Sequence, residues 1–251
     1  MYPFIHLGPI RLGTYGIMVA VALIAAFYVV QADLRRRVLN ADPNLIIGLT
    51  GLAGLVGARL YHVLESPGEF FADPWPQLFS TMGFAWFGSV IAGFITLLLI
   101  ARHYRIPALQ MLDVASPAAA LGYGIGRIGC LISGDGDYGT PTSLPWGMSF
   151  PNGIVPTTER VHPTPIYELL ASVVIFYILW RLGARWMRDP RSIGKLFGVY
   201  LILSGVARFL VEFIRLNPRS FLGMTNAQTA SLVGTIVGAF LLVRHRSIHQ
   251  T

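Results

Sequence analysis

The chain has 251 residues, of which 54% are hydrophobic and only 12% are charged, and its mean hydropathy is +0.59. Soluble domains carry about 25% charged residues, so this composition indicates an integral membrane protein. The net charge of +7 is spread over short loops, which excludes the concentrated basic surface of a nucleic-acid-binding domain. The single cysteine, Cys130, excludes an intrachain disulfide, and no histidine spacing predicts a metal site or another cofactor.

Apolar runs of about 20 residues follow one another along the chain, and each is long enough to cross about 30 Å of hydrocarbon as a helix. The first run lacks a basic leader and a small-residue cleavage site, so no cleavable signal is expected. We predict an all-α integral membrane protein, one domain over residues 1–251. Its seven transmembrane helices are expected at residues 12–30, 45–64, 83–101, 111–132, 166–182, 195–214 and 227–243.

Basic residues in the loops predict the orientation of these spans. Most of them follow the first, third, fifth and seventh spans, and the opposite side holds only Arg11, Arg160, Arg215 and Arg219. Because cytoplasmic loops carry the excess of lysine and arginine, we expect a periplasmic N-terminus and a cytoplasmic C-terminus.

Two of the periplasmic loops are long. Residues 65–82 contain "ESPGEFFADPWPQLF", whose aromatic residues and prolines suit a segment in the lipid headgroup region. Residues 133–165 are polar and rich in glycine and proline, and they far exceed the length that a helix hairpin needs. Long loops of this kind are usually functional or disordered, and the spaced aromatic residues here favour an ordered structure.

Three arginines lie within predicted spans, toward the outer leaflet: Arg59, Arg127 and Arg208. Four carboxylates fall near the same depth, namely Glu168, Glu212, Asp135 and Asp137. Such charges either form ion pairs that fasten helices, or snorkel, or line a functional cavity. We favour a cavity, because the arginines come from three different spans. Asp113, near the cytoplasmic start of the fourth span, is expected to be a capping or interface residue.

A cavity of this kind, more cationic than simple ion pairs need, suits an anionic lipid headgroup. A guanidinium group binds phosphate through two parallel hydrogen bonds, and nearby carboxylates orient the arginines. The glycines beside Arg127, Gly126 and Gly129, would let a headgroup approach the backbone. The same arginines would stabilise the charge that develops on a phosphate leaving group.

The chain resembles the bacterial prolipoprotein diacylglyceryl transferases from end to end. The motif "GRIGCLISGDGDYG", residues 126–139, is similar to the family signature Gly-Arg-x-Gly-Asn-Phe-x-Asn-x-Glu-x-x-Gly. Further matches are "GTYG" at 13–16, "GARLYHVLE" at 57–65, "LPWGMSFP" at 144–151, "HPTPIYE" at 162–168 and "RFLVEFIR" at 208–215.

This resemblance implies a reaction in the bacterial cytoplasmic membrane. The diacylglyceryl group of phosphatidylglycerol would pass to the lipobox cysteine thiol of a secreted prolipoprotein, releasing glycerol phosphate without a cofactor or metal. Carried over by position, the catalytic residues would be Arg127, Arg208, Glu212 and Asp135. The substrate-binding residues would be Tyr15, Arg59, Gly126, Gly129, Asp137, Gly139, Tyr167 and Glu168.

The chain also departs from the family pattern. Cys130 and Ser133 replace the two signature asparagines, and one extra residue precedes Gly139. Phe87 stands where the family usually has a histidine in the third span, a candidate general base. We expect Cys130 to be a small buried residue rather than a covalent carrier, and His162 to be a hydrogen-bonding loop residue.

Three interpretations therefore stay open. The protein is an active diacylglyceryl transferase in which Asp135, Asp137 or Glu212 takes the thiol proton, or in which the thiol ionises without a base. Alternatively, it is a paralogue that serves another acceptor from the same lipid site. The third interpretation is a catalytically silent phospholipid-binding protein.

Overall fold

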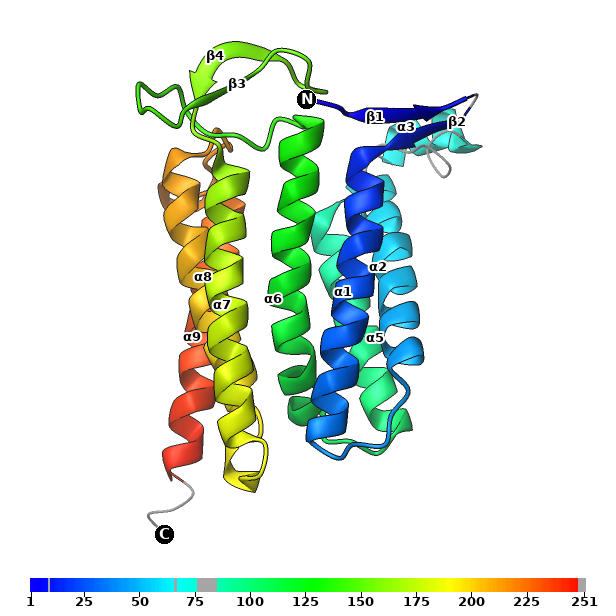
Figure 1. The fold of residues 1–251 in the computed structure, drawn as a ribbon, viewed down its shortest axis with the longest axis vertical. Helices are drawn as coiled ribbons and strands as arrows, with labels where there is room; N and C mark the ends of the chain where they lie inside the picture. Colours follow the sequence, from blue (N-terminus) through cyan, green and yellow to red (C-terminus); the bar gives the residue numbers. More distant parts are fainter. Residues whose placement is uncertain (9, 66, 76–84, 248–251) are drawn as a thin grey trace. The chain divides into compact units, whose positions relative to one another are not determined.

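The structure is a computed structural model that describes residues 1–8, 10–65, 67–75 and 85–247 (Figure 1). Six of its helical segments are long and apolar enough to cross a membrane, which confirms a multi-pass helical membrane protein. They are α1 (Thr14–Arg36), α2 (Pro43–Glu65), α5 (Trp86–His103), α7 (Thr164–Trp186), the segment Pro190–Ile214 that contains α8 (Lys195–Val211), and α9 (Asn226–Ser247). The predicted fourth span corresponds to α6 (Ala108–Ser133).

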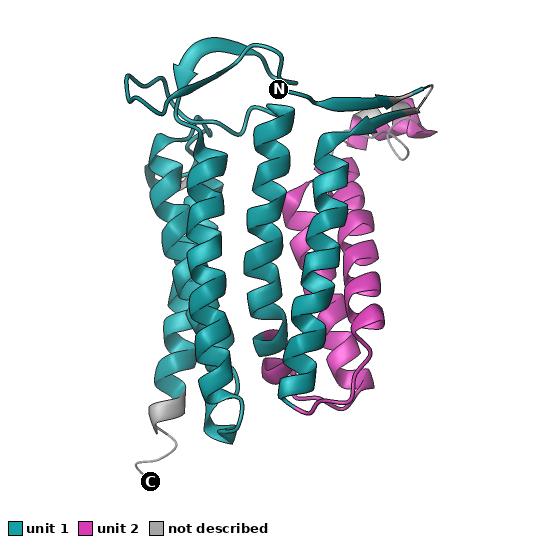
Figure 2. Cartoon of the chain, viewed as in Figure 1, with its two compact units in different colours: residues 1–37, 113–251 teal, residues 38–112 magenta. Residues whose placement is uncertain are grey.

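The chain divides into two compact units (Figure 2). Unit 1 contains Met1–Arg37 and Asp113–Thr251, and unit 2 contains Val38–Leu112. The single seven-span domain stays a prediction. Residues 76–82 of the first long loop, and residues 83–84 of the predicted third span, lie outside the described residues.

Unit 2 is built on close packing of α2 and α5, with the short helix α3 (Pro67–Ala72) after α2. A side chain at Gly57 or Gly88 would overlap the backbone of the facing helix. Such small residues let helices approach closely in lipid, where apolar surface alone gives little drive for association. Glycine therefore sets the distance between these two helices.

Unit 1 contains α1, α6, α7, α8 and α9. A buried cluster of Ala120, Ile175, Leu179 and Leu196 joins α6, α7 and α8. At the start of α8, the Asp113 carboxylate accepts hydrogen bonds from the amides of Gly194 (2.6 Å) and Phe197 (2.8 Å). This confirms Asp113 as a capping residue, although it caps a neighbouring helix rather than its own.

Two short hairpins, which the sequence did not predict, accompany the helices of unit 1. They are β1 (Phe4–Leu7) with β2 (Ile10–Gly13), and β3 (Met148–Phe150) with β4 (Thr157–Val161). The second hairpin, which lies beyond the end of α6 and the start of α7 in Figure 1, confirms that the long loop is ordered. Its core is a buried cluster of Tyr138, Phe150 and Val161.

Candidate active site

Charged side chains from three helices of unit 1 meet at Glu168. This carboxylate lies in the first turns of α7 and is 3% exposed. Its Oε1 lies 2.6 Å from Nη1 of Arg208 on α8, and its Oε2 lies 3.4 Å from Nε of Arg127 on α6. The structure therefore brings together two arginines that lie 81 positions apart in the sequence. These are the two arginines that the resemblance implies for a headgroup site.

A third arginine, Arg215, completes this group. Its Nη1 lies 3.3 Å from Oε2 of Glu168, and its Nη2 forms an ion pair with Asp137. Asp137 also forms an ion pair with Nη1 of Arg127. Glu212, which is buried, pairs with Nη2 of Arg208 at 2.9 Å. We call these six residues the arginine cluster: Arg127, Arg208, Arg215, Asp137, Glu168 and Glu212.

The arginine cluster carries equal numbers of positive and negative groups. The sequence predicted a site more cationic than ion pairs need, and this excess is not found within the cluster. Each arginine contacts at least two carboxylates, so its positive charge is balanced within the cluster. The same contacts hold each guanidinium group in a fixed orientation. Among the described residues, Arg127 makes these contacts through Nε and Nη1.

Two members of the site were missed by sequence reasoning. Arg215 was assigned to a loop and does lie beyond the end of the helix, where its backbone is extended, yet its side chain reaches Glu168, Asp137 and Glu212. Tyr123 lies one turn before Arg127, which stands 4.7 Å from its ring centre, and its hydroxyl donates to Glu168 Oε1 at 2.5 Å. Helical periodicity was the available signal for Tyr123, whereas the place of Arg215 depends on the backbone pairing with Gly139.

Gly139 brings Arg215 next to the loop that carries Asp137. The backbone of Gly139 pairs with that of Arg215, and the amide of Thr140 donates to the Ile214 carbonyl at 2.8 Å. A Cβ atom at Gly139 would lie only 2.5 Å from the Ile214 carbonyl oxygen. The closing glycine of the motif is therefore required by close backbone packing, and its predicted contact with substrate stays a prediction.

Asp135 and Asp137 have different environments although only Gly136 separates them. Burial alone would raise the pKa of the Asp137 carboxyl, but Arg215 and Arg127 hold it below its usual range. Burial raises the pKa of Asp135, and the negative charge of Asp137 raises it further. Within the described ranges, Asp135 forms no ion pair with an arginine. Of these two aspartates, Asp137 is therefore the one that orients arginines of the cluster.

The other predicted substrate-binding residues of unit 1 surround this cluster. Tyr15 of α1 is 47% exposed and packs on Gly129, where a Cβ would lie 3.0 Å from its ring. A Cβ at Gly126 would meet no atom within 4 Å. Tyr167 accepts a hydrogen bond from the Trp146 indole at 2.8 Å, and its hydroxyl lies 3.2 Å from Nδ1 of His162. Contact of these residues with substrate stays a prediction.

Unit 2 holds two positions that the sequence singled out. Arg59 on α2 is buried, and Phe87 lies in the first turn of α5 with 37% of its surface exposed. The prediction that Arg59 shares a site with Arg127 and Arg208 stays a prediction. Phenylalanine carries no titratable group, so position 87 supplies no general base.

Cys130 is buried one turn after Arg127, and its Sγ lies 3.6 Å from Nη1 of that arginine. The same Sγ lies within 4.8 Å of carboxylate oxygens of Asp135 and Asp137. A metal ion placed among these groups would compete with two guanidinium groups for Asp137. The pairing of Asp137 with Arg127 and Arg215 therefore disfavours a metal ion at this position.

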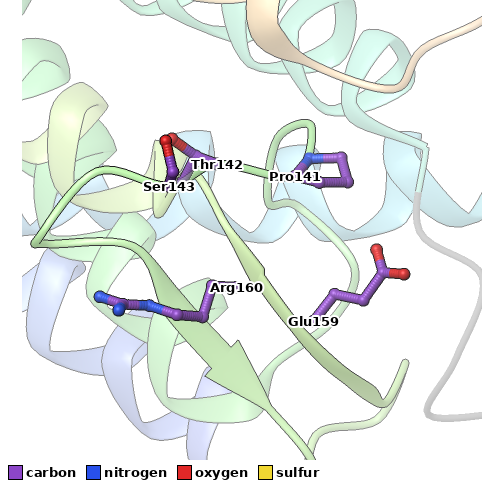
Figure 3. Close-up of a pocket in the computed structure, with 5 residues that line it drawn as sticks. All are labelled: Pro141, Thr142, Ser143, Glu159 and Arg160. Atoms are coloured by element: carbon purple, nitrogen blue, oxygen red, sulfur yellow. The ribbon is translucent and has the colours of Figure 1, made fainter.

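An open pocket lies on the surface of the long loop at residues 133–165, lined by Pro141, Thr142, Ser143, Glu159 and Arg160 (Figure 3). The side chains of Glu159 and Arg160 point away from each other in this view. Arg160 donates to the carbonyls of Leu144, Pro145 and Gly147. Its guanidinium group thus stabilises the backbone of the loop. The arginine cluster is therefore the better candidate for an active site.

Comparison with known proteins identifies the family of the chain. A family described as prolipoprotein diacylglyceryl transferase matches residues 3–244. The chain is 32% identical over 231 residues to the phosphatidylglycerol–prolipoprotein diacylglyceryl transferase of Clostridium tetani, with 90% of each chain covered. It is also 32% identical to the protein of that name from Cupriavidus metallidurans, with 95% of this chain and 91% of the relative covered. The relative of that name from Trichormus variabilis is 31% identical, with 97% and 90% covered. The chain therefore belongs to the prolipoprotein diacylglyceryl transferase family.

Proposed function

We propose that this protein transfers the diacylglyceryl group of phosphatidylglycerol to the lipobox cysteine thiol of secreted prolipoproteins and releases glycerol phosphate. The observation that carries the proposal is the convergence of Arg127 and Arg208 on Glu168. Family relatives named for this reaction match along nearly the whole chain. The arginine cluster then supplies what the reaction needs, a fixed site for a phosphate that becomes a leaving group.

The phosphate of phosphatidylglycerol would bind at the accessible sides of Arg127 and Arg208. Their side chains are 13% and 23% exposed, and Glu168 and Glu212 hold them from the buried side. Nη2 of Arg127 is then ready to donate to a phosphate oxygen. Because the carboxylates fix the guanidinium groups before substrate arrives, little reorganisation is needed during the reaction.

In the chemical step, the thiolate sulfur of the acceptor attacks the glyceryl carbon that carries the phosphate. A carbon–sulfur bond forms as the carbon–oxygen bond breaks, and its electrons leave with the phosphate oxygen. The departing glycerol phosphate gains negative charge, which the two arginines stabilise. A group that interacts more strongly with the transition state than with the bound substrate lowers the activation barrier of the chemical step.

We also propose that α6 is a seventh span, with a periplasmic N-terminus, a cytoplasmic C-terminus and the cytoplasmic membrane as location. The 26-residue helix has two charges, Asp113 and Arg127, and both are partnered. The excess of basic residues after every second span supports the orientation. Single-cysteine labelling from each side tests it, in a Cys130→Ser background. Labelling of residues 140–160 only from the cytoplasm would contradict the orientation.

The function is tested by expressing the protein in bacteria depleted of their own transferase. We expect prolipoproteins to gain the mass of a diacylglyceryl group. Correct insertion without any modification would contradict the proposal. Phosphatidylglycerol that co-purifies without turnover would identify a lipid-binding protein. This outcome would fit the absence of a titratable side chain at position 87, where the family usually has a histidine.

The role of Arg127 is tested by Arg127→Lys. An ammonium group cannot reproduce the planar two-bond grip on phosphate, so we expect a loss of at least about 10²-fold in turnover. Arg160→Lys, in the loop pocket outside the arginine cluster, is the matched control. Equal turnover of Arg127→Lys and the unaltered protein would contradict phosphate binding by Arg127.

A further inference from the structure

The acceptor thiol needs a proton acceptor. A free cysteine has a pKa of about 8.5, so only a small fraction is thiolate at neutral pH. This inference rests on the proposed function, because it concerns the thiol that the proposed reaction alkylates. The described carboxylates around the arginine cluster differ in whether they are free to take that proton.

Three of these carboxylates are committed to arginines. Asp137 pairs with Arg127 and Arg215. Glu168 contacts all three arginines of the cluster. Protonating either one would leave guanidinium groups unpaired in a largely buried site, which is energetically costly.

Glu212 is committed in the same way. It pairs with Arg208 at 2.9 Å and accepts a hydrogen bond from Asn217 at 2.5 Å. It is also buried, so an incoming thiol has no direct path to it. These contacts suit Glu212 to orienting Arg208 rather than to exchanging protons with substrate.

Asp135 differs from all three. Like Asp137 it is partly exposed, but within the described ranges no arginine or lysine forms an ion pair with it. Its Oδ1 accepts a hydrogen bond from the Asp137 amide at 3.2 Å, and its carboxylate lies within 4.8 Å of the Cys130 thiol. A carboxylate with this exposure, beside the arginines but not bound to them, is free to accept a proton.

The backbone of the loop holds Asp135 in place. Gly134 and Gly136, on either side of it, both have positive φ angles, 59° and 93°. Gly134 packs on Gly153 so closely that a Cβ on either residue would overlap the other's backbone. The amide of Val155 donates to the Gly134 carbonyl at 2.9 Å. These contacts fix the backbone on both sides of Asp135.

We propose that Asp135 is the general base that accepts the proton of the acceptor thiol, and that Asp137 orients the arginines without exchanging protons. The thiol proton passes to the Asp135 carboxylate as the sulfur attacks the glyceryl carbon. The bonding electrons of the broken carbon–oxygen bond leave with the phosphate. Asp135 then releases its proton to water, and the site returns to its starting state.

The opposite pKa shifts of the two aspartates agree with this division of roles. The pKa of Asp135 is raised, by burial and by Asp137, whereas Arg215 and Arg127 lower that of Asp137 against the effect of burial. A base whose pKa lies closer to that of the thiol accepts its proton more readily. Neighbouring acids with pKa values pushed apart are typical of acid–base sites. The titratable or charged groups that face Asp135 are Tyr15 from α1, Arg127 and Cys130 from α6, and Asp137 and Tyr138 from the loop.

The test is the pH dependence of kcat/KM for the purified full chain in phosphatidylglycerol-containing micelles with a synthetic lipobox peptide. Peptide modification is measured by mass from about pH 3 to about pH 10, a range that includes the ordinary pKa values of the aspartate carboxyl and of the cysteine thiol. For Asp135→Asn we expect kcat/KM to fall about 10²-fold at pH 7. The loss should shrink as pH rises past about 8.5, because the peptide thiol then ionises by itself.

Asp137→Asn is the matched control, because it removes a carboxylate two residues away. It should lower kcat/KM at every pH and show no recovery at high pH, since it disturbs the arginines and not the proton transfer. A merely structural role for Asp135 would give the same uniform loss. The proposal is overturned if the two profiles are parallel, or if Asp137→Asn alone recovers.

Asp135→Glu covers the case in which Asp135→Asn does not fold. It keeps a carboxylate in a different position, so the acidic limb of the profile should persist at a shifted pH. A profile of folded Asp135→Glu that lacks the acidic limb would contradict the proposal. If the unaltered protein modifies no peptide and releases no glycerol phosphate at any pH, the proposed function itself fails, whereas activity with parallel profiles refutes only the role of Asp135.

Discussion

Replacing Glu168 by glutamine tests whether the arginine cluster is held together at its centre. Glu168 is 3% exposed and contacts Arg127, Arg208 and Arg215 as well as the Tyr123 hydroxyl. Glu168→Gln leaves three guanidinium groups facing two carboxylates, so one positive charge loses its compensation. Removing one partner from a buried ion pair costs about 3–5 kcal/mol. Because the amide keeps one acceptor oxygen, we expect the lower end, about 3 kcal/mol.

The loss should appear in both stability and turnover. For a chain of this size, about 3 kcal/mol corresponds to a fall of roughly 6–12 °C in the unfolding temperature. Turnover should fall by about 10²–10³-fold, the range seen when one fixed stabilising group of a reaction site is removed. The assays are thermal unfolding in detergent and initial rates of peptide modification.

Tyr123→Phe provides the matched control for Glu168→Gln. It removes one hydrogen bond to the same carboxylate without changing charge, at a cost of about 1.5 kcal/mol, the lower end for a hydrogen bond to a charged group. The reasoning would be refuted if Glu168→Gln kept the original unfolding temperature and rate. It would also be refuted if Tyr123→Phe were as damaging, because charge compensation would then not be the main effect.

Three further outcomes are expected. Gly139→Ala should lose about 1–3 kcal/mol of stability and most activity, because its Cβ would press on the Ile214 carbonyl. Gly126→Ala should keep its stability, because its Cβ would meet no atom within 4 Å. Equal unfolding temperatures of these two variants would contradict this expectation. The pKa of Asp137 is lowered from its ordinary value of 3.8, so its ionised carboxylate stabilises the folded protein above about pH 3.8. This stabilisation is lost as pH falls through the folded-state pKa. In Asp137→Asn, acid unfolding followed by spectroscopy should lack this contribution. Asp113→Asn should cost about 0.5–2 kcal/mol through the weakened cap on α8 while leaving turnover intact, and a fall in rate without unfolding would argue against a purely capping role.

Residue patterns in the sequence were sufficient for the membrane helices and for two of the central arginines. Long apolar runs predict spans because lipid forces every backbone group to bond within its own helix. Arg127 and Arg208 were identifiable because an arginine within an apolar run is costly unless it has a partner. The capping role of Asp113 was expected from its position near a helix end, although its partner helix was not.

Only the tertiary structure decided how the charges are paired. Arg215 follows its helix in a segment that looks like an ordinary loop, and it joins the cluster because Gly139 lets two backbone segments approach. The two aspartates of "DGD" are chemically identical in the sequence. Their carboxylates lie close together in the structure, but only Asp137 pairs with Arg127 and Arg215, which leaves Asp135 as the candidate base. Spans follow from local composition, whereas pairing depends on contacts between residues far apart in the chain, which composition does not record.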